Sequence, residues 1–152
     1  MRWFGRSSGR FGPAPIDDKA LLLVDLDGVV YRGAEAIPGA VAELNRAGAA
    51  LPLAYVTNNA SRTDVSVAAH LRELGLNVAP TDVVTSPQAA VELLARTVEP
   101  GSLVLIVGGD GLIDERQKAG FRVTRSAADD PAAVVQGFAP HVGWEQLAEA
   151  AF

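Results

Sequence analysis

Two carboxylates stand two positions apart directly after an apolar stretch, and they are the residues best placed to do chemistry. Residues 20–24 are apolar, and Asp25, Asp27 and Gly28 follow them. Burying a carboxylate costs free energy unless a cation or a hydrogen-bond donor meets it. The pair therefore predicts a site for a divalent metal or a phosphate group, with a strand-end turn as the alternative.

A second polar group follows another apolar stretch. Residues 51–56 are mostly apolar, and Thr57, Asn58 and Asn59 come next. Because ligands bind at the carboxyl ends of parallel strands, we expect both groups to face one crevice. A carboxylate nucleophile, a second carboxyl group that gives and takes a proton, and nearby hydroxyl and amide donors suit phosphoryl transfer. The alternative for Thr57 to Asn59 is a capping turn before a helix.

The elements that must position these side chains alternate between strand and helix, which predicts an α/β fold with a mostly parallel sheet. Ser61 and Thr63 are the candidate N-caps of the helix after the second polar group. The expected strands are 21–26, 51–56, 83–85, 103–107, 121–124 and 133–136. The expected helices are 37–47, a helix ending before residue 75, 86–98, a helix ending at 120, and 143–151. The chemistry is therefore expected on strand ends.

Composition narrows the function classes. The chain has 152 residues, a formal charge of -5 and no cysteine, so a basic nucleic-acid surface, disulfides and thiolate metal sites are not expected. Its apolar runs are shorter than the roughly 20 residues that span a bilayer, so no membrane partner is expected and the cytoplasm is the expected location.

A metal bound by the oxygen ligands of this chain, which has no cysteine and only two histidines, is expected to be Mg²⁺ rather than zinc. Residues 1–18 are interpreted as a flexible tail.

At its two polar groups the sequence resembles the haloacid dehalogenase superfamily of phosphohydrolases, subfamily IIA (NagD-like). The first family motif resembles residues 25–29 (DLDGV), and the second resembles residues 56–59 (VTNN). The resemblance continues through residues 82–86, 107–112 and 133–138. It implies a Rossmann-like catalytic core with an inserted α/β cap, and hydrolysis of a small phosphorylated metabolite, with glycerol 3-phosphate and 2-phosphoglycolate as the leading substrates.

The resemblance also implies residue roles. Asp25 would be the nucleophile that forms an aspartyl-phosphate and a Mg²⁺ ligand. Asp27 would act as acid and base while its backbone carbonyl binds the metal. The implied phosphate- or substrate-binding residues are Gly28, Thr57, Asn58, Asn59 and Arg62, with solvation of a helix start as the alternative for Arg62. A homodimer formed through the cap is a further arrangement that the resemblance allows.

Two family motifs have no counterpart in this sequence. The third needs a lysine and the fourth an acidic pair, but Lys19 and Lys118 are the only lysines and neither stands in such a motif. Asp129 and Asp130 precede a proline and are interpreted as turn residues. We therefore expect an N-terminal fragment with little or no activity, comprising the tail 1–18, half of the core over 19–86 and part of the cap over 87–152. Such a half-core should leave a sheet edge and a helix-contact face exposed.

Other interpretations stay open. The chain could be a non-catalytic pseudo-phosphatase, or an interaction fragment that pairs with a separately encoded half. A receiver-like phosphoacceptor fits the acidic pattern less well. The glycine-rich residues 108–111 are expected to form a turn into a helix rather than a nucleotide loop. His70 and His141 lack partners at ligand spacing. Phe138 and Trp144 are expected to pack in a core or a cap interface, with a position at the border of the substrate site as the alternative.

Overall fold

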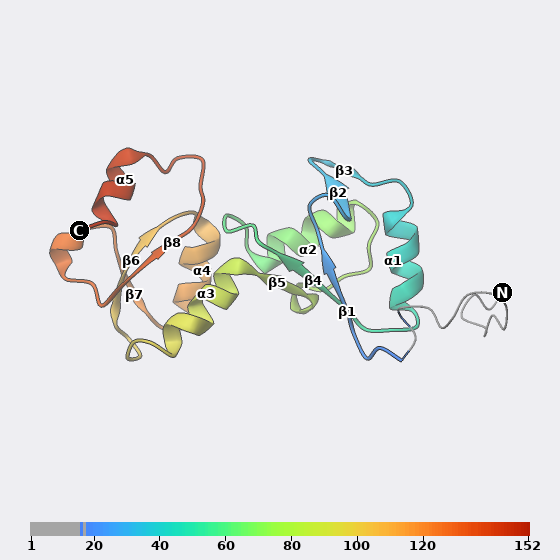
Figure 1. The fold of residues 1–152 in the computed structure, drawn as a ribbon, viewed down its shortest axis with the longest axis horizontal. Helices are drawn as coiled ribbons and strands as arrows, with labels where there is room; N and C mark the ends of the chain where they lie inside the picture. The colour runs from blue at the N-terminus through green and yellow to red at the C-terminus, as the bar shows by residue number, and fades with distance from the viewer. Residues whose placement is uncertain (1–15, 17) are drawn as a thin grey trace.

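The computed structural model describes residue 16 and residues 18–152, so the tail expected over 1–18 lies almost wholly outside the described residues. Two parallel three-stranded sheets, each with its own helices, lie side by side along the long axis of the molecule (Figure 1). We call the part up to strand β5 the first unit and the part from helix α3 onward the second unit. The α/β fold with parallel strands is confirmed.

The first unit has the strand order β1-β4-β5, with β1 spanning Leu22–Asp25, β4 Leu53–Thr57 and β5 Val83–Thr85. Helix α1 spans Ala40–Gly48 and helix α2 spans Asp64–Glu73. A short hairpin, β2 (Tyr31–Arg32) and β3 (Glu35–Ala36), follows β1. One sheet face is buried: Val24, Tyr55 and Val83 pack in one cluster with Val67 and Leu71 of α2.

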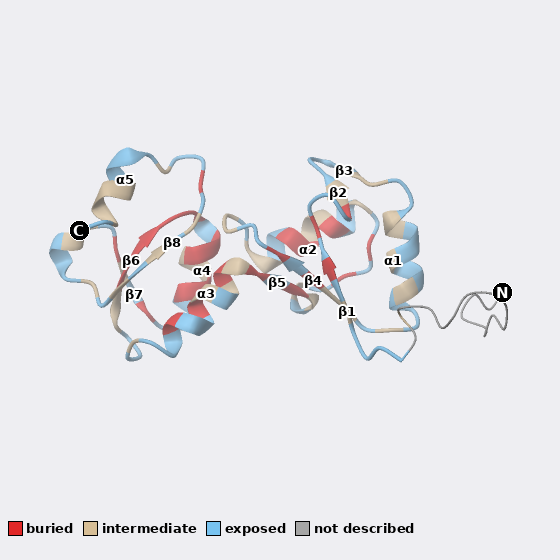
Figure 2. Ribbon diagram, in the orientation of Figure 1, coloured by how far each residue is buried: buried red, intermediate tan, exposed pale blue. Residues whose placement is uncertain are grey.

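The opposite face of the first sheet is open to solvent. Leu23 is 64% exposed, Val84 43% and Val56 37%, and the strand register places them among residues that alternate with the buried ones. Helix α2 covers the other side of this sheet with its buried residues Val67, Ala68 and Leu71, and Figure 2 shows buried and intermediate residues on this helix. The expected uncovered helix-contact face is therefore confirmed, and we call Leu23, Val56 and Val84 the open face.

The second unit has the strand order β7-β6-β8. Central β6 spans Leu103–Val107, with β7 at Arg122–Thr124 and β8 at Ala133–Gln136. The helices are α3 (Ser86–Ala95), α4 (Asp110–Lys118) and α5 (Trp144–Glu149), with a short 3-10 turn, η2 (Ala127–Asp129). A second 3-10 turn, η1 (Pro80–Asp82), belongs to the first unit and precedes β5. Val104, Ile106 and Leu112 are almost completely buried and form the centre of a second core.

Local chemistry explains why the helices begin where they do. Thr63 is the N-cap of α2, because its Oγ1 accepts a hydrogen bond of 3.1 Å from the backbone N–H of Ser66. Thr85 ends β5 and caps α3 in a capping box with Gln88, whose Oε1 accepts a 2.8 Å bond from the Thr85 N–H. Of the two candidate caps, Thr63 is confirmed, while the Ser61 hydroxyl donates instead to Asn59 Oδ1 at 2.7 Å.

Three expectations for single residues now have outcomes. Residues 108–111 form a turn into α4, as expected. Asp129 accepts a hydrogen bond from the Thr124 hydroxyl and Asp130 has a left-handed φ of 54°, so the turn role of this pair is confirmed. Core packing of Phe138 and Trp144 is wrong for the described residues, because their exposed fractions are 67% and 83%, while packing at a cap interface stays a prediction. Phe138 lies in the loop after β8 and Trp144 begins α5, and an aromatic side chain at such a place is buried only if another element covers it.

Candidate functional site

The two polar groups lie at the same edge of the first sheet. Strand β1 ends at Asp25, which pairs in register with Val56, and Thr57 is the last residue of the adjacent parallel strand β4. The carboxyl ends of both strands therefore meet, as expected from their parallel order. Asp27 lies two residues beyond the end of β1 and forms an isolated bridge with Tyr31.

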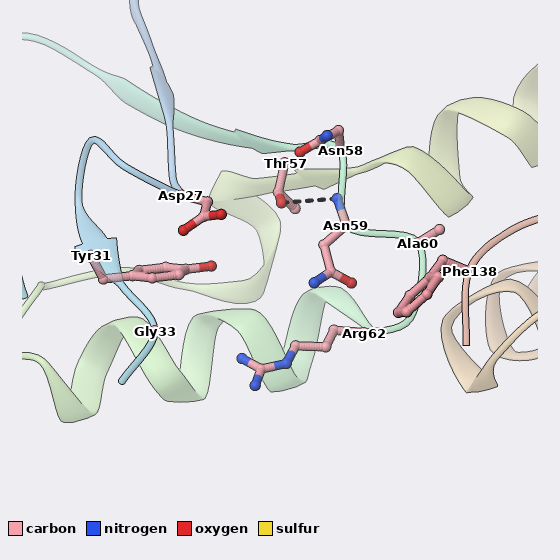
Figure 3. Close-up of a pocket in the computed structure, with 9 residues that line it drawn as sticks. All are labelled: Asp27, Tyr31, Gly33, Thr57, Asn58, Asn59, Ala60, Arg62 and Phe138. Atoms are coloured by element: carbon pink, nitrogen blue, oxygen red, sulfur yellow. Dashed lines mark hydrogen bonds between the residues drawn. The ribbon is translucent and has the colours of Figure 1, made fainter. Parts of the chain in front are cut away.

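A pocket of about 480 Å³ opens at this edge (Figure 3). It brings together five of the seven residues singled out in the sequence, and four further residues complete its wall. Its lining residues are Asp27, Tyr31, Gly33, Thr57, Asn58, Asn59, Ala60, Arg62 and Phe138. Asp25 and Gly28 do not line it. Asp25 is solvent-exposed at the end of β1, and its Oδ1 accepts a 2.8 Å hydrogen bond from the N–H of Leu26.

Gly28 has a structural task next to the pocket. Its φ is +78°, a conformation that residues with a Cβ seldom adopt. Its N–H donates to the carbonyl of Tyr31 at 2.8 Å. This tight turn folds the β2–β3 hairpin back over Asp27, so the hairpin supplies Tyr31 and Gly33 to the pocket wall.

Side-chain caps hold the loop after β4 in place. Thr57 is 5% exposed, and its Oγ1 accepts a hydrogen bond from the Asn59 N–H at 3.1 Å. Asn59 Oδ1 accepts from both the N–H (2.9 Å) and the hydroxyl (2.7 Å) of Ser61. The Asn59 oxygen is thus occupied, while its NH₂ group and the Thr57 hydroxyl hydrogen can donate to an anion in the pocket.

Opposite charges share the pocket. Arg62 is a cation on its wall and Asp27 an anion, and both act on the Tyr31 phenol between them. Burial raises the pKa of Tyr31, Arg62 lowers it, and Asp27 and Asp25 raise it, with a net upward shift. Tyr31 is therefore an uncharged phenol at neutral pH and a hydrogen-bond donor, and Figure 3 shows its hydroxyl directed into the pocket.

Three lining residues, Tyr31, Gly33 and Ala60, were missed in the sequence. One of them carries a signal that could have been used: Gly33 opens a two-residue hairpin loop with a φ of 61°, so glycine after Tyr31-Arg32 indicated a turn that returns the chain to Asp27. Nothing local singles out Ala60. Phe138 lines the pocket, which agrees with the alternative that it borders the substrate site. It comes shortly after β8, where the carboxyl-end rule for parallel strands applies to the second sheet as well.

The two carboxylates at and just after the end of β1 suit a hard cation, although only Asp27 of the two lines the pocket. Asp25 and Asp27 offer oxygen ligands near one strand end, and Mg²⁺ prefers oxygen ligands. A second acidic group, Asp64, Asp114 and Glu115, lies away from the pocket. The ammonium group of Lys118 is 2.6 Å from Glu115, 2.9 Å from Asp114 and 3.5 Å from Asp64, so this group already has its counter-ion.

No helix within residues 18–152 is long and apolar enough to cross a membrane. Neither histidine belongs to a group of three potential metal ligands among the described residues. The expectation that His70 lacks an acidic partner is wrong, because its Nδ1 lies 3.8 Å from Glu73 Oε2. His70 also contacts the Tyr31 ring edge-on, with ring centroids 5.0 Å apart.

The part of the chain that carries the pocket is similar to known proteins. Residues 22–122 match the model of a family described as haloacid dehalogenase-like hydrolases. The chain is 48% identical over 130 residues to a D-glycerol 3-phosphate phosphatase of Mycobacterium tuberculosis, covering 86% of this chain and 36% of that protein. It is 37% identical over 129 residues to an acid sugar phosphatase of Staphylococcus aureus, covering 83% of this chain and 48% of that protein.

Solved structures show the same fold. A crystal structure of a glycerol phosphate phosphatase from Mycobacterium tuberculosis in complex with magnesium superposes with a TM-score of 0.79 at 47% identity, over 87% of this chain and 40% of that one. NagD from Escherichia coli superposes with a TM-score of 0.75 at 31% identity, over 87% and 51%. The chain therefore spans between about a third and a half of the length of these relatives.

Proposed function

The chain belongs to the haloacid dehalogenase-like hydrolase family, and from this premise we propose that it carries the nucleophile-bearing part of a Mg²⁺-dependent phosphomonoester hydrolase. The observation that carries the proposal is the convergence of Asp27, Thr57, Asn58, Asn59 and Arg62 in one pocket at the carboxyl edge of a parallel sheet. The two relatives described above, which match this chain over 130 and 129 residues, are named as phosphatases.

The proposed reaction uses the two aspartates in turn. An oxygen of Asp25 attacks phosphorus and forms an aspartyl-phosphate, while the bond from phosphorus to the substrate oxygen breaks and Asp27 gives that oxygen a proton. Asp27 then takes a proton from water, whose oxygen attacks the same phosphorus and releases inorganic phosphate and free Asp25. Bound Mg²⁺ would neutralise charge on the phosphoryl oxygens, with Asp25 and the Asp27 backbone carbonyl as its ligands from this chain.

The loop after β4 would hold the transferring group. The Thr57 hydroxyl and the side-chain amides of Asn58 and Asn59 supply donors at the pocket wall. Tyr31 and Arg62 are further polar residues of the pocket wall, and they suit the hydroxyl or carboxylate groups of a small metabolite. These groups are consistent with glycerol 3-phosphate or 2-phosphoglycolate as substrate.

This chain alone is proposed to be inactive. The described residues place no lysine in the pocket, so the charge of Asp25 and the phosphate would lack a cationic partner other than Arg62 and the metal. We assign 19–86 to half of a catalytic core and 87–152 to part of a cap. A cytoplasmic location and a homodimer formed through the second unit belong to the same proposal, and cell fractionation and sedimentation of the expressed chain test them.

Complementation tests the proposal directly. The segment of the Mycobacterium tuberculosis phosphatase that follows its match to this chain is co-expressed with residues 1–152, and phosphate release from glycerol 3-phosphate is measured with and without Mg²⁺. We expect Mg²⁺-dependent release from the complex, none from either part alone, and none from the complex with Asp25→Asn. A stable complex without release in Mg²⁺ would contradict the proposed enzyme.

That last result would instead favour a non-catalytic module that pairs with another polypeptide. The open face supports this second candidate, because Leu23, Val56 and Val84 offer an apolar sheet surface that a partner could cover. Pairing would then be detected by co-purification and lost in a Leu23→Lys variant. Phosphate release that depends on Asp25 would overturn this candidate.

A further inference from the structure

The loop from Asn58 to Asp64 belongs to the first unit, and besides its own hydrogen bonds it makes several contacts with the second unit. The hydroxyl of Ser86, the first residue of α3, donates to the Asn58 carbonyl at 3.1 Å. Figure 3 shows Ala60 next to Phe138, which follows β8. The loop that carries Asn58, Asn59 and Arg62 therefore lies against the second unit along its length.

Three glycines form the surface that meets this loop. We call Gly109, Gly111 and Gly137 the glycine face. A Cβ on Gly111 would lie 2.7 Å from the carbonyl oxygen of Arg62 and 3.2 Å from its nitrogen. A Cβ on Gly137 would lie 3.2 Å from the Cβ of Ala60, and one on Gly109 would lie 3.5 Å from the Cα of Ser61. The backbone of Arg62 thus contacts α4 so closely that only glycine fits at position 111.

A charged link holds the other end of the loop. Asp64, the first residue of α2, is 15% exposed in its side chain and lies 3.5 Å from the ammonium group of Lys118 at the end of α4. Its other carboxylate oxygen accepts a 3.3 Å hydrogen bond from Gln88 of α3. The glycine face and this link are separate contacts between the two units. The glycine face contacts the loop up to Arg62, and the link holds Asp64, two residues further along the chain.

We propose that Gly111 and Lys118 of the second unit are positioning residues for Arg62. The inference rests on the proposed function in one respect, namely that Arg62 binds substrate. A loop that is free to move must be ordered each time Arg62 binds an anion, and each ordered residue costs conformational entropy. Contacts with the glycine face and with Lys118 order the loop beforehand. The second unit therefore contributes to substrate binding through residues that do not touch the substrate.

The first test needs no ligand. In the full chain, Gly111→Ala is compared with Gly143→Ala, whose Cβ would lie 3.4 Å from the flexible end of the Gln146 side chain. Backbone amide exchange at Asn59 and Ser61 and the Arg62 Nε–H resonance are followed by NMR. We expect Gly111→Ala to speed exchange at both amides by at least about fivefold and to shift the Arg62 resonance, with no such change in Gly143→Ala. Unchanged loop signals in a folded Gly111→Ala would overturn the inference.

Lys118→Met decides the matter if Gly111→Ala fails to fold. This variant adds no atoms at the contact and removes the charge opposite Asp64. Faster exchange at Asn59 and Ser61, with the amides of β1 unchanged, supports the positioning role. Exchange at the parent rate in the loop overturns it.

Ligand binding then separates this inference from the proposed function. Affinities for inorganic phosphate and for glycerol 3-phosphate are measured in Mg²⁺ on the co-expressed complex used to test the proposed function. We expect Gly111→Ala to weaken glycerol 3-phosphate binding at least about fivefold and to weaken phosphate binding less, because phosphate uses the donors of Asn58 and Asn59 but not Arg62. The effect on glycerol 3-phosphate should be smaller when Gly111→Ala is combined with Arg62→Ala, and an equal effect in the Arg62→Ala background overturns positioning. If neither ligand binds the parent complex, the proposed function fails, while the loop measurements still decide whether Gly111 orders the loop.

Discussion

Two substitutions, one that shortens Leu112 and one that adds a methyl group at Gly137, give a quantitative test of the packing beneath the glycine face. Leu112 is 2% exposed, and a Cβ built on Gly137 would lie 2.5 Å from its Cδ1. Leu112→Ala should lower the free energy of unfolding by about 3 kcal/mol, because a buried leucine leaves a cavity. Gly137→Ala should cost about 2 kcal/mol, because the new methyl group overlaps Leu112.

The double variant should be less destabilised than the sum of the two single changes. The alanine methyl at 137 enters the space that Leu112 leaves, so we expect a total loss of about 3 kcal/mol instead of about 5. Urea denaturation followed by far-ultraviolet circular dichroism measures all four proteins, with equal slopes as the check for a common unfolding transition. Additivity within about 0.5 kcal/mol would refute the packing described here.

Two further predictions concern ionisation and capping. Burial raises the pKa of Tyr31 and of Tyr55, so absorbance at the phenolate band should show both tyrosines of the folded chain ionising above pH 10, whereas in denaturant they ionise near about 10. Because the folded state holds these protons more tightly, their contribution to stability is complete below about pH 10 and falls as the pH rises through the folded pKa values; ionisation at the denatured-state pH would contradict the burial. Thr63→Ala should cost about 1 kcal/mol in thermal or urea unfolding, because the N-cap bond to Ser66 is lost. Ser61→Ala, which removes no N-cap, is the matched control, and an equal loss in both would show that the cap is not the cause.

The pocket draws its walls from both units. Phe138 is the one described lining residue that comes from the second unit, and the same unit contacts the loop of Asn59 and Arg62 through the glycine face. A change in the position of the second unit would therefore move the aromatic wall and the cationic wall together. We expect substitutions at the contact between the units to change the shape of the pocket, as substitutions in the pocket itself do.

The sequence by itself determined the alternation of strands and helices and the position of the two polar groups. Apolar runs bounded by turn residues are local signals, so β5, β6 and β8 have the expected bounds. The bounds of β1, β4 and β7 differ from the expected ones by one or two residues. The parallel order then required that Asp25 and Thr57 meet at one edge. The β2–β3 hairpin was missed because strands of two residues carry too few positions for a periodic pattern.

Only the tertiary structure decided which other residues reach the site. Tyr31 lines the pocket because a turn at Gly28 folds the hairpin over Asp27, and Phe138 lines it because a second sheet stands beside the first. In the sequence, Gly111 indicates only a turn or the start of a helix. In the structure, the position that a Cβ of residue 111 would occupy lies against the backbone of Arg62. Such roles depend on what lies opposite a residue in space, and residues far apart in the chain become neighbours only when both units are folded.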